Sequence, residues 1–193
     1  MRASAGRTRI DDLRQPAAIF LAISLISVLV ALAGGGTTSA RSELIGAQAP
    51  DFGLLGADGR PTKLSDLRDR PVWLTFFSTW CTRCRAENPD IEAVHREEQK
   101  AGRDLFILGV GVAELPLTVR EYARNAGLTF PMGADLERVV APRYGVLTLP
   151  THVFLDRAGV VRQFCVGALR PEKMRQLVDA LSAEGSVPTV PDC

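Results

Sequence analysis

The sequence has almost no net charge and very little histidine, and both shortages exclude classes of function. Its 23 lysines and arginines nearly balance 22 aspartates and glutamates, and the arginines are scattered, so the sequence predicts no basic surface for nucleic acid. A structural zinc site needs four ligands, but the outlying candidates His95, His152, Cys165 and Cys193 are isolated from one another. We therefore expect no nucleic-acid partner, no metal and no cofactor.

Charge is also absent from one long segment, residues 17–36, which is almost entirely apolar. At about 20 residues this segment can span a bilayer as a helix, and the four arginines before it predict a cytoplasmic N-terminus. A cleaved signal peptide is the alternative, since small residues at 31–33 or 38–40 offer cleavage sites. The run is long for a signal peptide, so we favour a single-pass anchor in the bacterial inner or plasma membrane. Either interpretation places the rest of the chain outside the cytoplasm, in the periplasm, where disulfides persist.

The chain is long enough for one globular domain with appendages, because 46% of its 193 residues are hydrophobic. Small and polar residues after the apolar segment predict a flexible linker. The end of the chain has two prolines and no periodicity, which is typical of a loose tail. The expected division is a cytoplasmic segment 1–16, an anchor or signal sequence 17–36, a linker 37–43, one domain 44–184 and a C-terminal tail 185–193.

Strand-like segments recur through this domain. Residues 72–77 and 105–112 are short apolar runs typical of strands buried on both faces. The charged stretch 83–100 between them is predicted to be a helix, with a proline inside it that should bend it. Residues 151–156 and 160–166 are separated by a short Gly-containing turn and predict a β-hairpin. The first three segments form a strand–helix–strand unit.

Two further helices are expected. One carries apolar residues at helical spacing, with Thr118 and Glu121 as a capping box at its start and Gly127 at its end. The other begins at Pro171 and ends the domain. His95, on the charged helix, is expected to face solvent. Helices that alternate with strands predict an α/β domain in which a mixed sheet is flanked by helices.

A pair of cysteines, Cys81 and Cys84, follows the first buried strand and the residue Trp80. A permanent disulfide across so short a loop would stabilise the fold little, because it constrains the unfolded chain little. At the N-terminus of the next helix, however, the helix dipole stabilises a thiolate. The pattern predicts a redox couple in which Cys81 is the exposed nucleophile and Cys84 resolves the mixed disulfide.

The segment FFSTWCTRCRAENP resembles the active-site segment of the membrane-anchored, thioredoxin-like thiol–disulfide oxidoreductases of bacteria, the TlpA/ResA/CcmG type. The resemblance covers about 140 residues. Its opening pattern APDF…G…LSDL is similar to the family's N-terminal β-hairpin, and YGVLTLPTHVFLDRAGVV is similar to its second landmark. It therefore implies a thioredoxin-like fold with an N-terminal β-hairpin extension.

The resemblance also assigns further site residues. It implies a cis bond between Leu149 and Pro150, beside the cysteines, where the backbone can pair with a substrate strand. Trp80 joins these two residues as a candidate for substrate binding. Glu87 lies one helical turn after Cys84 and corresponds to a buried acid that accepts and returns the Cys84 proton. Without the family, an ordinary strand-start proline and a solvent-facing glutamate would be the simpler interpretations.

This sequence departs from the family pattern between its cysteines, where it has no proline. Arg83 and Arg85 flank the pair, and their positive charge is expected to stabilise the Cys81 thiolate and make the couple more oxidising. Cys165 is interpreted as a buried apolar residue, with a Cys165–Cys193 disulfide as an alternative. His152 could lie on either face of its strand, and we assign it no catalytic role.

The leading interpretation is an enzyme, a thiol–disulfide oxidoreductase that reduces specific protein disulfides. Family resemblance implies substrates in cytochrome c maturation or copper-site assembly, and a membrane electron donor that recycles the couple. One alternative is a peroxiredoxin-like peroxidase, since APDF also opens that relative, although Ser78 replaces the threonine expected three residues before the reactive cysteine. A non-enzymatic copper chaperone is the other, although such proteins space their cysteines by three residues.

Overall fold

The computed structural model describes residues 43–182. The predicted cytoplasmic segment, anchor and tail lie outside this range, as does the linker apart from residue 43. In chain order the elements are β1 (Gly53–Gly56), β2 (Pro61–Lys63), the 3-10 helix η1 (Leu64–Leu67), β3 (Val72–Phe77), α3 (Thr82–Lys100), β4 (Phe106–Val112), α4 (Pro116–Ala126), β5 (Met132–Asp135), α5 (Val140–Arg143), β6 (Thr151–Leu155), β7 (Val161–Val166) and α6 (Pro171–Ser182). Within this range no helix is long and apolar enough to cross a membrane.

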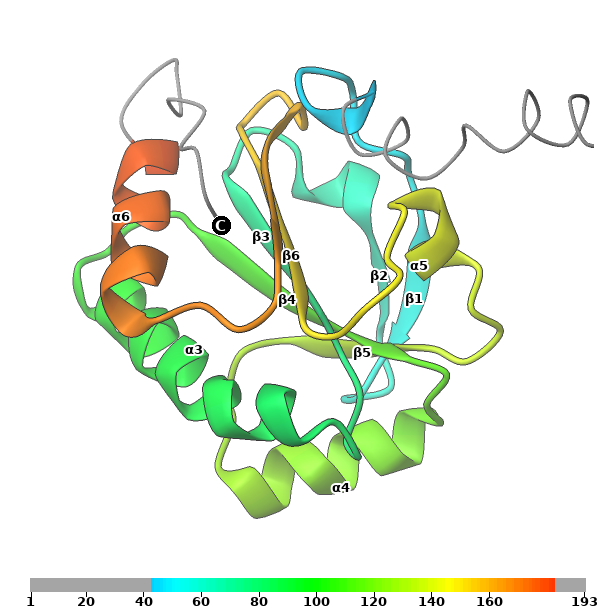
Figure 1. Cartoon of the computed structure of the whole chain (residues 1–193). Coiled ribbons are helices and arrows are strands. Elements are labelled where there is room, and N and C mark those ends of the chain that lie inside the picture. Colours follow the sequence, from blue (N-terminus) through cyan, green and yellow to red (C-terminus); the bar gives the residue numbers. More distant parts are fainter. Residues whose placement is uncertain (1–42, 183–193) are drawn as a thin grey trace, which may run out of the picture. The chain divides into compact units, whose positions relative to one another are not determined.

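The strands form one seven-stranded sheet in the order β2-β1-β5-β4-β3-β6-β7 (Figure 1). Strands β3, β4 and β5 are parallel, whereas β6 is antiparallel to β3 and β1 is antiparallel to β5. The carboxyl ends of the three parallel strands and the amino end of β6 therefore meet at the same edge of the sheet. Ligand and substrate sites of open α/β sheets form at this edge.

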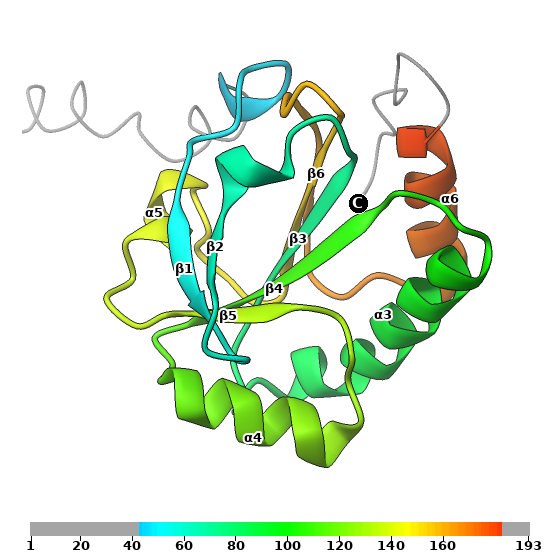
Figure 2. The same ribbon diagram turned by 180° about the vertical axis from the view of Figure 1, so that it is seen from behind.

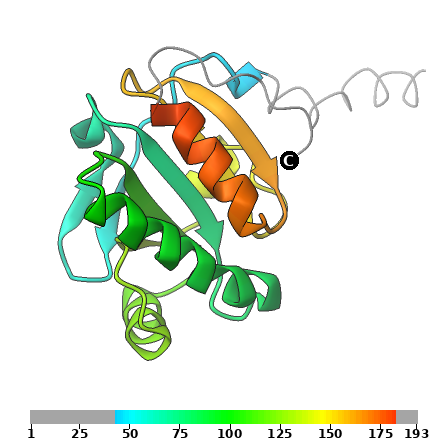
Figure 3. The same ribbon diagram turned by 90° about the vertical axis from the view of Figure 1, so that its left-hand side faces the viewer.

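Both faces of the sheet are covered, which explains why β3 is apolar apart from Thr75 and buried at every position. Helices α3 and α6 lie side by side on one face (Figure 3), where the core also includes residues of α4. The opposite face packs against α5, η1 and the segment before β1 (Figure 2). Strand β4 owes its close packing to two glycines. A Cβ at Gly109 would lie 2.9 Å from Met132 Cγ, and one at Gly111 would lie 2.7 Å from Val119 Cγ2.

Most of the predicted elements are confirmed. The strand–helix–strand unit is β3–α3–β4, and Pro89 lies inside α3. The hairpin of β6 and β7 and the N-terminal hairpin of β1 and β2 are antiparallel, as expected. Helix α6 begins at Pro171, and Gly127 ends α4 with a left-handed φ of 67°. The mixed sheet with flanking helices is the predicted α/β, thioredoxin-like fold.

Two expectations were wrong, and one strand was missed. Helix α4 begins at Pro116 rather than at Thr118, because a proline suits the first helical position, so Thr118 and Glu121 form no capping box. Strand β5 was not predicted, since its sequence MGAD lacks strand formers; it is buried between β4 and β1. His95 is buried against the Phe130 ring instead of facing solvent, and burial lowers its pKa.

A segment that we call the strap, residues 46–50, joins the domain at the turn between β6 and β7. The Gly46 amide donates to the Val161 carbonyl at 2.8 Å, and the Ala49 amide donates to the Gly159 carbonyl at 2.9 Å. The Tyr144 hydroxyl donates to the carbonyl of Pro50 at 2.7 Å, and burial raises the pKa of Tyr144, so the hydroxyl stays protonated. This turn lies beside the amino end of β3, at the edge opposite to its carboxyl end.

Candidate active site

Cys81 and Cys84 lie at the sheet edge where β3, β4 and β5 end and β6 begins. Cys81 is the N-cap of α3, and the amide of Cys84 donates to its sulfur at 3.2 Å. The two cysteines form a disulfide with an S–S distance of 2.12 Å and a Cα–Cα distance of 5.3 Å. Cys81 retains 8% of its surface, whereas Cys84 is fully buried. The first cysteine is thus the accessible one, at a helix N-terminus whose amides and dipole stabilise a thiolate.

The loop before Cys81 is held by the end of β4. The Ser78 hydroxyl donates to the Val112 carbonyl at 2.8 Å. The carboxylate of Glu114 accepts the Thr79 amide at 2.7 Å and the Thr79 hydroxyl at 2.8 Å. Glu114 itself is buried and follows Ala113, whose φ is +57°. Sequence reasoning missed Glu114, since no local pattern marks a carboxylate that contacts a loop 35 residues away.

A depression of about 460 Å³ opens beside Cys81. It is lined by Trp80 from the loop after β3, Arg138 from the loop after β5, and Leu147 and Leu149 from the segment before β6. Trp80 is 72% exposed and Leu147 is 65% exposed, which is unusual for large apolar side chains. The depression can therefore accept side chains of a polypeptide whose disulfide approaches Cys81.

The segment before β6 has the backbone that the sequence predicted. The bond between Leu149 and Pro150 is cis. Pro150 is buried and its carbonyl accepts the Gly167 amide at 2.9 Å, while Leu149 is half-buried in the depression beside Cys81. Trp80 and Leu149, both expected to bind substrate, therefore line the same depression, and Pro150 fixes the segment behind them.

Glu87 is buried one turn after Cys84 on α3, so the interpretation as a solvent-facing glutamate is wrong. Its Oε1 accepts the Leu169 amide at 2.6 Å, from the loop between β7 and α6. The same oxygen lies 3.2 Å from Nε2 of His152 on β6. Alternation along β6 places His152 on the α3 side of the sheet, a choice that the sequence left open. The structure thus brings a buried carboxylate and an imidazole together on the same side of the sheet as Cys84.

The remaining candidates take other positions. Arg83 and Arg85 are exposed on the first turn of α3, on either side of Cys84. Cys165 is buried on β7, as expected, and there is no free cysteine among residues 43–182. Its proposed pairing with Cys193 involves a residue outside the described part of the chain and stays a prediction.

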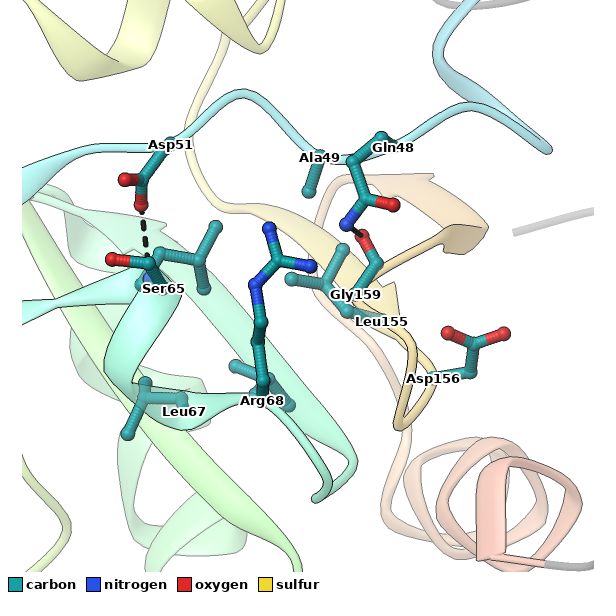
Figure 4. A pocket seen from close by; sticks show the side chains of 11 residues that line it. Gln48, Ala49, Asp51, Ser65, Leu67, Arg68, Leu155, Asp156 and Gly159 are labelled. Atoms are coloured by element: carbon teal, nitrogen blue, oxygen red, sulfur yellow. Dashed lines mark hydrogen bonds between the residues drawn. The ribbon is translucent and has the colours of Figure 1, made fainter.

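Two other hollows in the described part contain no cysteine and no histidine. One, of about 570 Å³, is lined by the β1–β2 hairpin, α4 and the segment before β5. A small cleft between the strap and the β6–β7 turn, lined by Gln48, Arg68 and Gly159 among others, has a volume of about 20 Å³ (Figure 4). It lies at the edge of the sheet opposite to the cysteines. It has room for about one water molecule. Over residues 43–182 no three His, Cys, Asp or Glu side chains come together as metal ligands. The sheet edge that carries the Cys81–Cys84 disulfide is therefore the candidate active site.

Comparison with known proteins agrees with this geometry. The profile of the AhpC/TSA family matches residues 45–164. The thiol-disulfide oxidoreductase ResA of Geobacillus thermodenitrificans is 36% identical over 137 residues, which cover 71% of this chain and 78% of that protein. The thioredoxin-like protein YneN of Bacillus subtilis is 33% identical over 134 residues, covering 69% and 78%.

A solved structure is similar as well. A Chlorobium tepidum structure, named as a thiol:disulfide interchange protein DsbE, superimposes with a TM-score of 0.66 at 27% identity, covering 72% of this chain and 98% of that one. ResA and the DsbE structure carry names of disulfide-exchanging proteins, and YneN is named as thioredoxin-like.

Proposed function

Because the chain belongs to the thioredoxin-like thiol–disulfide oxidoreductases of the TlpA/ResA/CcmG type, within the AhpC/TSA family, we propose that it reduces specific protein disulfides outside the cytoplasm. The observation that carries the proposal is the cysteine pair at the N-terminus of α3, in which Cys81 lines an open depression and Cys84 is fully buried. The exposed apolar side chains of Trp80 and Leu147 in the depression beside Cys81 support a polypeptide substrate.

The reaction proceeds in two exchanges. The Cys81 thiolate attacks a substrate disulfide, a Cys81–substrate bond forms, and the other substrate sulfur leaves as a thiolate that takes up a proton. Cys84 then loses its proton to Glu87 and attacks Cys81, which releases the second substrate thiol and leaves the Cys81–Cys84 disulfide. Two electrons pass from the protein to the substrate. A membrane electron donor returns them, and cysteines of apocytochrome c or of a copper site are the proposed substrates.

The location belongs to the same proposal. The apolar segment 17–36, preceded by arginines, supports a single-pass anchor with the domain in the periplasm. A fusion of alkaline phosphatase after residue 41 tests it, since this reporter folds only where disulfides form. Activity of the fusion supports the location, and an inactive, fully expressed fusion contradicts it.

Two alternatives are less well supported. A peroxidase would need its reactive cysteine as a free thiol beside a hydroxyl. Here the Ser78 hydroxyl donates a hydrogen bond to the Val112 carbonyl, and Cys81 forms a disulfide with Cys84. A copper chaperone would need further ligands beside the two cysteines. Within residues 43–182 no three His, Cys, Asp or Glu side chains are grouped as metal ligands.

The decisive experiment measures the reduction potential of the couple in the full chain. The protein is equilibrated with glutathione buffers, alkylated, and the peptide that carries Cys81 and Cys84 is quantified by mass spectrometry, so other cysteines do not interfere. A potential at or below about −230 mV, in the range of reducing thioredoxin-like proteins, supports the proposal. A potential near about −120 mV, typical of strong oxidants, contradicts the reductive direction. Stoichiometric copper binding without a reversible couple would favour the chaperone.

A further inference from the structure

His152 occupies a buried position that the reaction described above does not use. Its ring is fully buried on β6, opposite Thr75 of β3 and Cys165 of β7 in the sheet register. The indole N–H of Trp73 donates to its Nδ1 at 3.3 Å, and the two rings meet edge to face at 5.8 Å. Two contacts from Trp73, a hydrogen bond and a ring contact, therefore fix the orientation of this buried imidazole.

The contact with Trp73 fixes where the imidazole carries its proton. An indole N–H is a donor only, so Nδ1 of His152 must be the acceptor and the proton of the neutral ring is at Nε2. This Nε2–H lies 3.2 Å from Oε1 of Glu87. The distance is that of an ion pair, but the angles are not those of a hydrogen bond, and Nε2 and the second oxygen of Glu87 are both buried without one. The Nε2 proton of His152 is therefore close to the Glu87 carboxylate but forms no hydrogen bond with it.

Glu87 is the charged group that the structure places against His152. From β3, Trp73 and Thr75 are neutral; from β7, Cys165 is not a free thiol; and α6 contributes apolar side chains to the same cluster. The hydroxyl of Thr75 is also buried without a hydrogen bond. Behind Cys84 the core thus contains a small group of polar atoms, in which a carboxylate faces an N–H donor and neutral surroundings.

We propose that His152, held as the Nε2–H tautomer by Trp73, is a positioning residue that keeps Glu87 ionised and ready to take the Cys84 proton. An N–H donor next to a buried carboxylate favours its charged form, which is the form that can act as a base. When Cys84 gives up its proton, Glu87 becomes protonated, and the proton returns to Cys84 when the couple is reduced again. This inference rests on the proposed exchange reaction and adds a residue to it.

The test uses His152→Leu, which removes the donor, and His152→Gln, whose amide can both accept from Trp73 and donate to Glu87. The full chain is reduced, mixed with a glutathione-linked peptide disulfide, and the rate at which Cys84 closes the intramolecular disulfide is followed by rapid quench from pH 5 to pH 9. We expect the His152→Leu rate near pH 6 to fall by about tenfold and its profile to move to higher pH, because the N–H dipole that faces the Glu87 carboxylate at 3.2 Å is lost. His152→Gln should restore most of the rate.

Glu87→Gln separates this inference from the proposed function. In that background His152→Leu should have no further effect on the profile. If Glu87→Gln slows closure but His152→Leu does not, the inference about His152 is refuted and the oxidoreductase remains. If the wild-type couple closes no disulfide, the proposed function itself fails. A loss of rate that His152→Gln does not rescue and that follows thermal stability would also overturn the inference.

Nitrogen NMR of the wild-type protein supplies a measurement that does not depend on a His152 variant. The ¹⁵N shifts of His152 should show a protonated Nε2 and an unprotonated Nδ1, and Trp73→Phe should mix the two tautomers. A ring protonated at Nδ1 would overturn the proposal, since Trp73 could not donate to it and Glu87 would lose its donor.

Discussion

The contact between Glu114 and Thr79 holds the loop that carries the reactive cysteine, and its removal gives a sharp prediction. In Glu114→Ala two hydrogen bonds disappear, and the Thr79 amide is left without its partner. Bonds to a charged acceptor contribute roughly 1.5 kcal/mol each at the low end, so the free energy of unfolding should fall by about 3 kcal/mol. Domains of this kind have roughly 5–15 kcal/mol in total, so the loss is large.

Two milder variants divide this loss. Thr79→Val keeps the hydrogen bond from the Thr79 amide to Glu114 and removes the one from the hydroxyl. We therefore expect the free energy of unfolding to fall by about 1–1.5 kcal/mol. Glu114→Gln keeps an acceptor oxygen but removes the charge, and it should lose a similar amount. Glu121→Ala, an exposed carboxylate on α4, is the matched control and should change stability by less than about 0.5 kcal/mol.

Guanidinium denaturation of the oxidised protein, followed by fluorescence, measures these losses. We expect Glu114→Ala to have the lowest free energy of unfolding. Thr79→Val and Glu114→Gln should be intermediate, and Glu121→Ala should be as stable as the wild type. If Glu114→Ala loses less than about 1 kcal/mol, the carboxylate does not hold the loop and the reasoning from buried hydrogen bonds fails here.

Three further predictions follow from other contacts. Arg83→Ala should make the potential of the couple more negative, because one positive charge beside the Cys81 thiolate is lost; an unchanged or more positive potential in a glutathione titration would contradict this. Burial lowers the pKa of His95, so the unfolded chain binds a proton at higher pH than the folded one, and the free energy of unfolding should fall as the pH drops below about 6.5, the unperturbed value. In denaturation experiments from pH 8 to pH 5, His95→Phe should lose less stability than the wild type, and an identical slope would refute the assignment. Gly109→Ala should lower the melting temperature through about 1–3 kcal/mol of overpacking against Met132, and a neutral effect in calorimetry would show that the core can relax there.

Signals in neighbouring residues allowed the redox centre to be predicted. The cysteine spacing, the buried strand before it and the helix after it are all local, and the segment around Pro150 carries a family pattern that the cis bond confirms. The hairpin of β6 and β7 and the end of α4 at Gly127 were predicted for the same reason.

What the sequence did not reveal depends on contacts across the fold. Strand β5 is a strand because β4 and β1 lie on either side of it, and its own residues do not favour the conformation. His152 faces Glu87 because the register of β6 against β3 places it there, and a shift of one residue would have turned it to the other face. Glu114 contacts Thr79 only because β4 lies next to β3. Such pairs are set by the sheet register, which no short pattern encodes.

The strap has a consequence for how the protein can meet its partners. Its residues attach beside the amino end of β3, and the cysteines follow the carboxyl end of that strand, six residues or about 20 Å away. The strap and the disulfide therefore occupy opposite edges of the sheet. A polypeptide that reaches Cys81 does not have to displace the strap, and changes in the strap should leave the depression beside Cys81 intact.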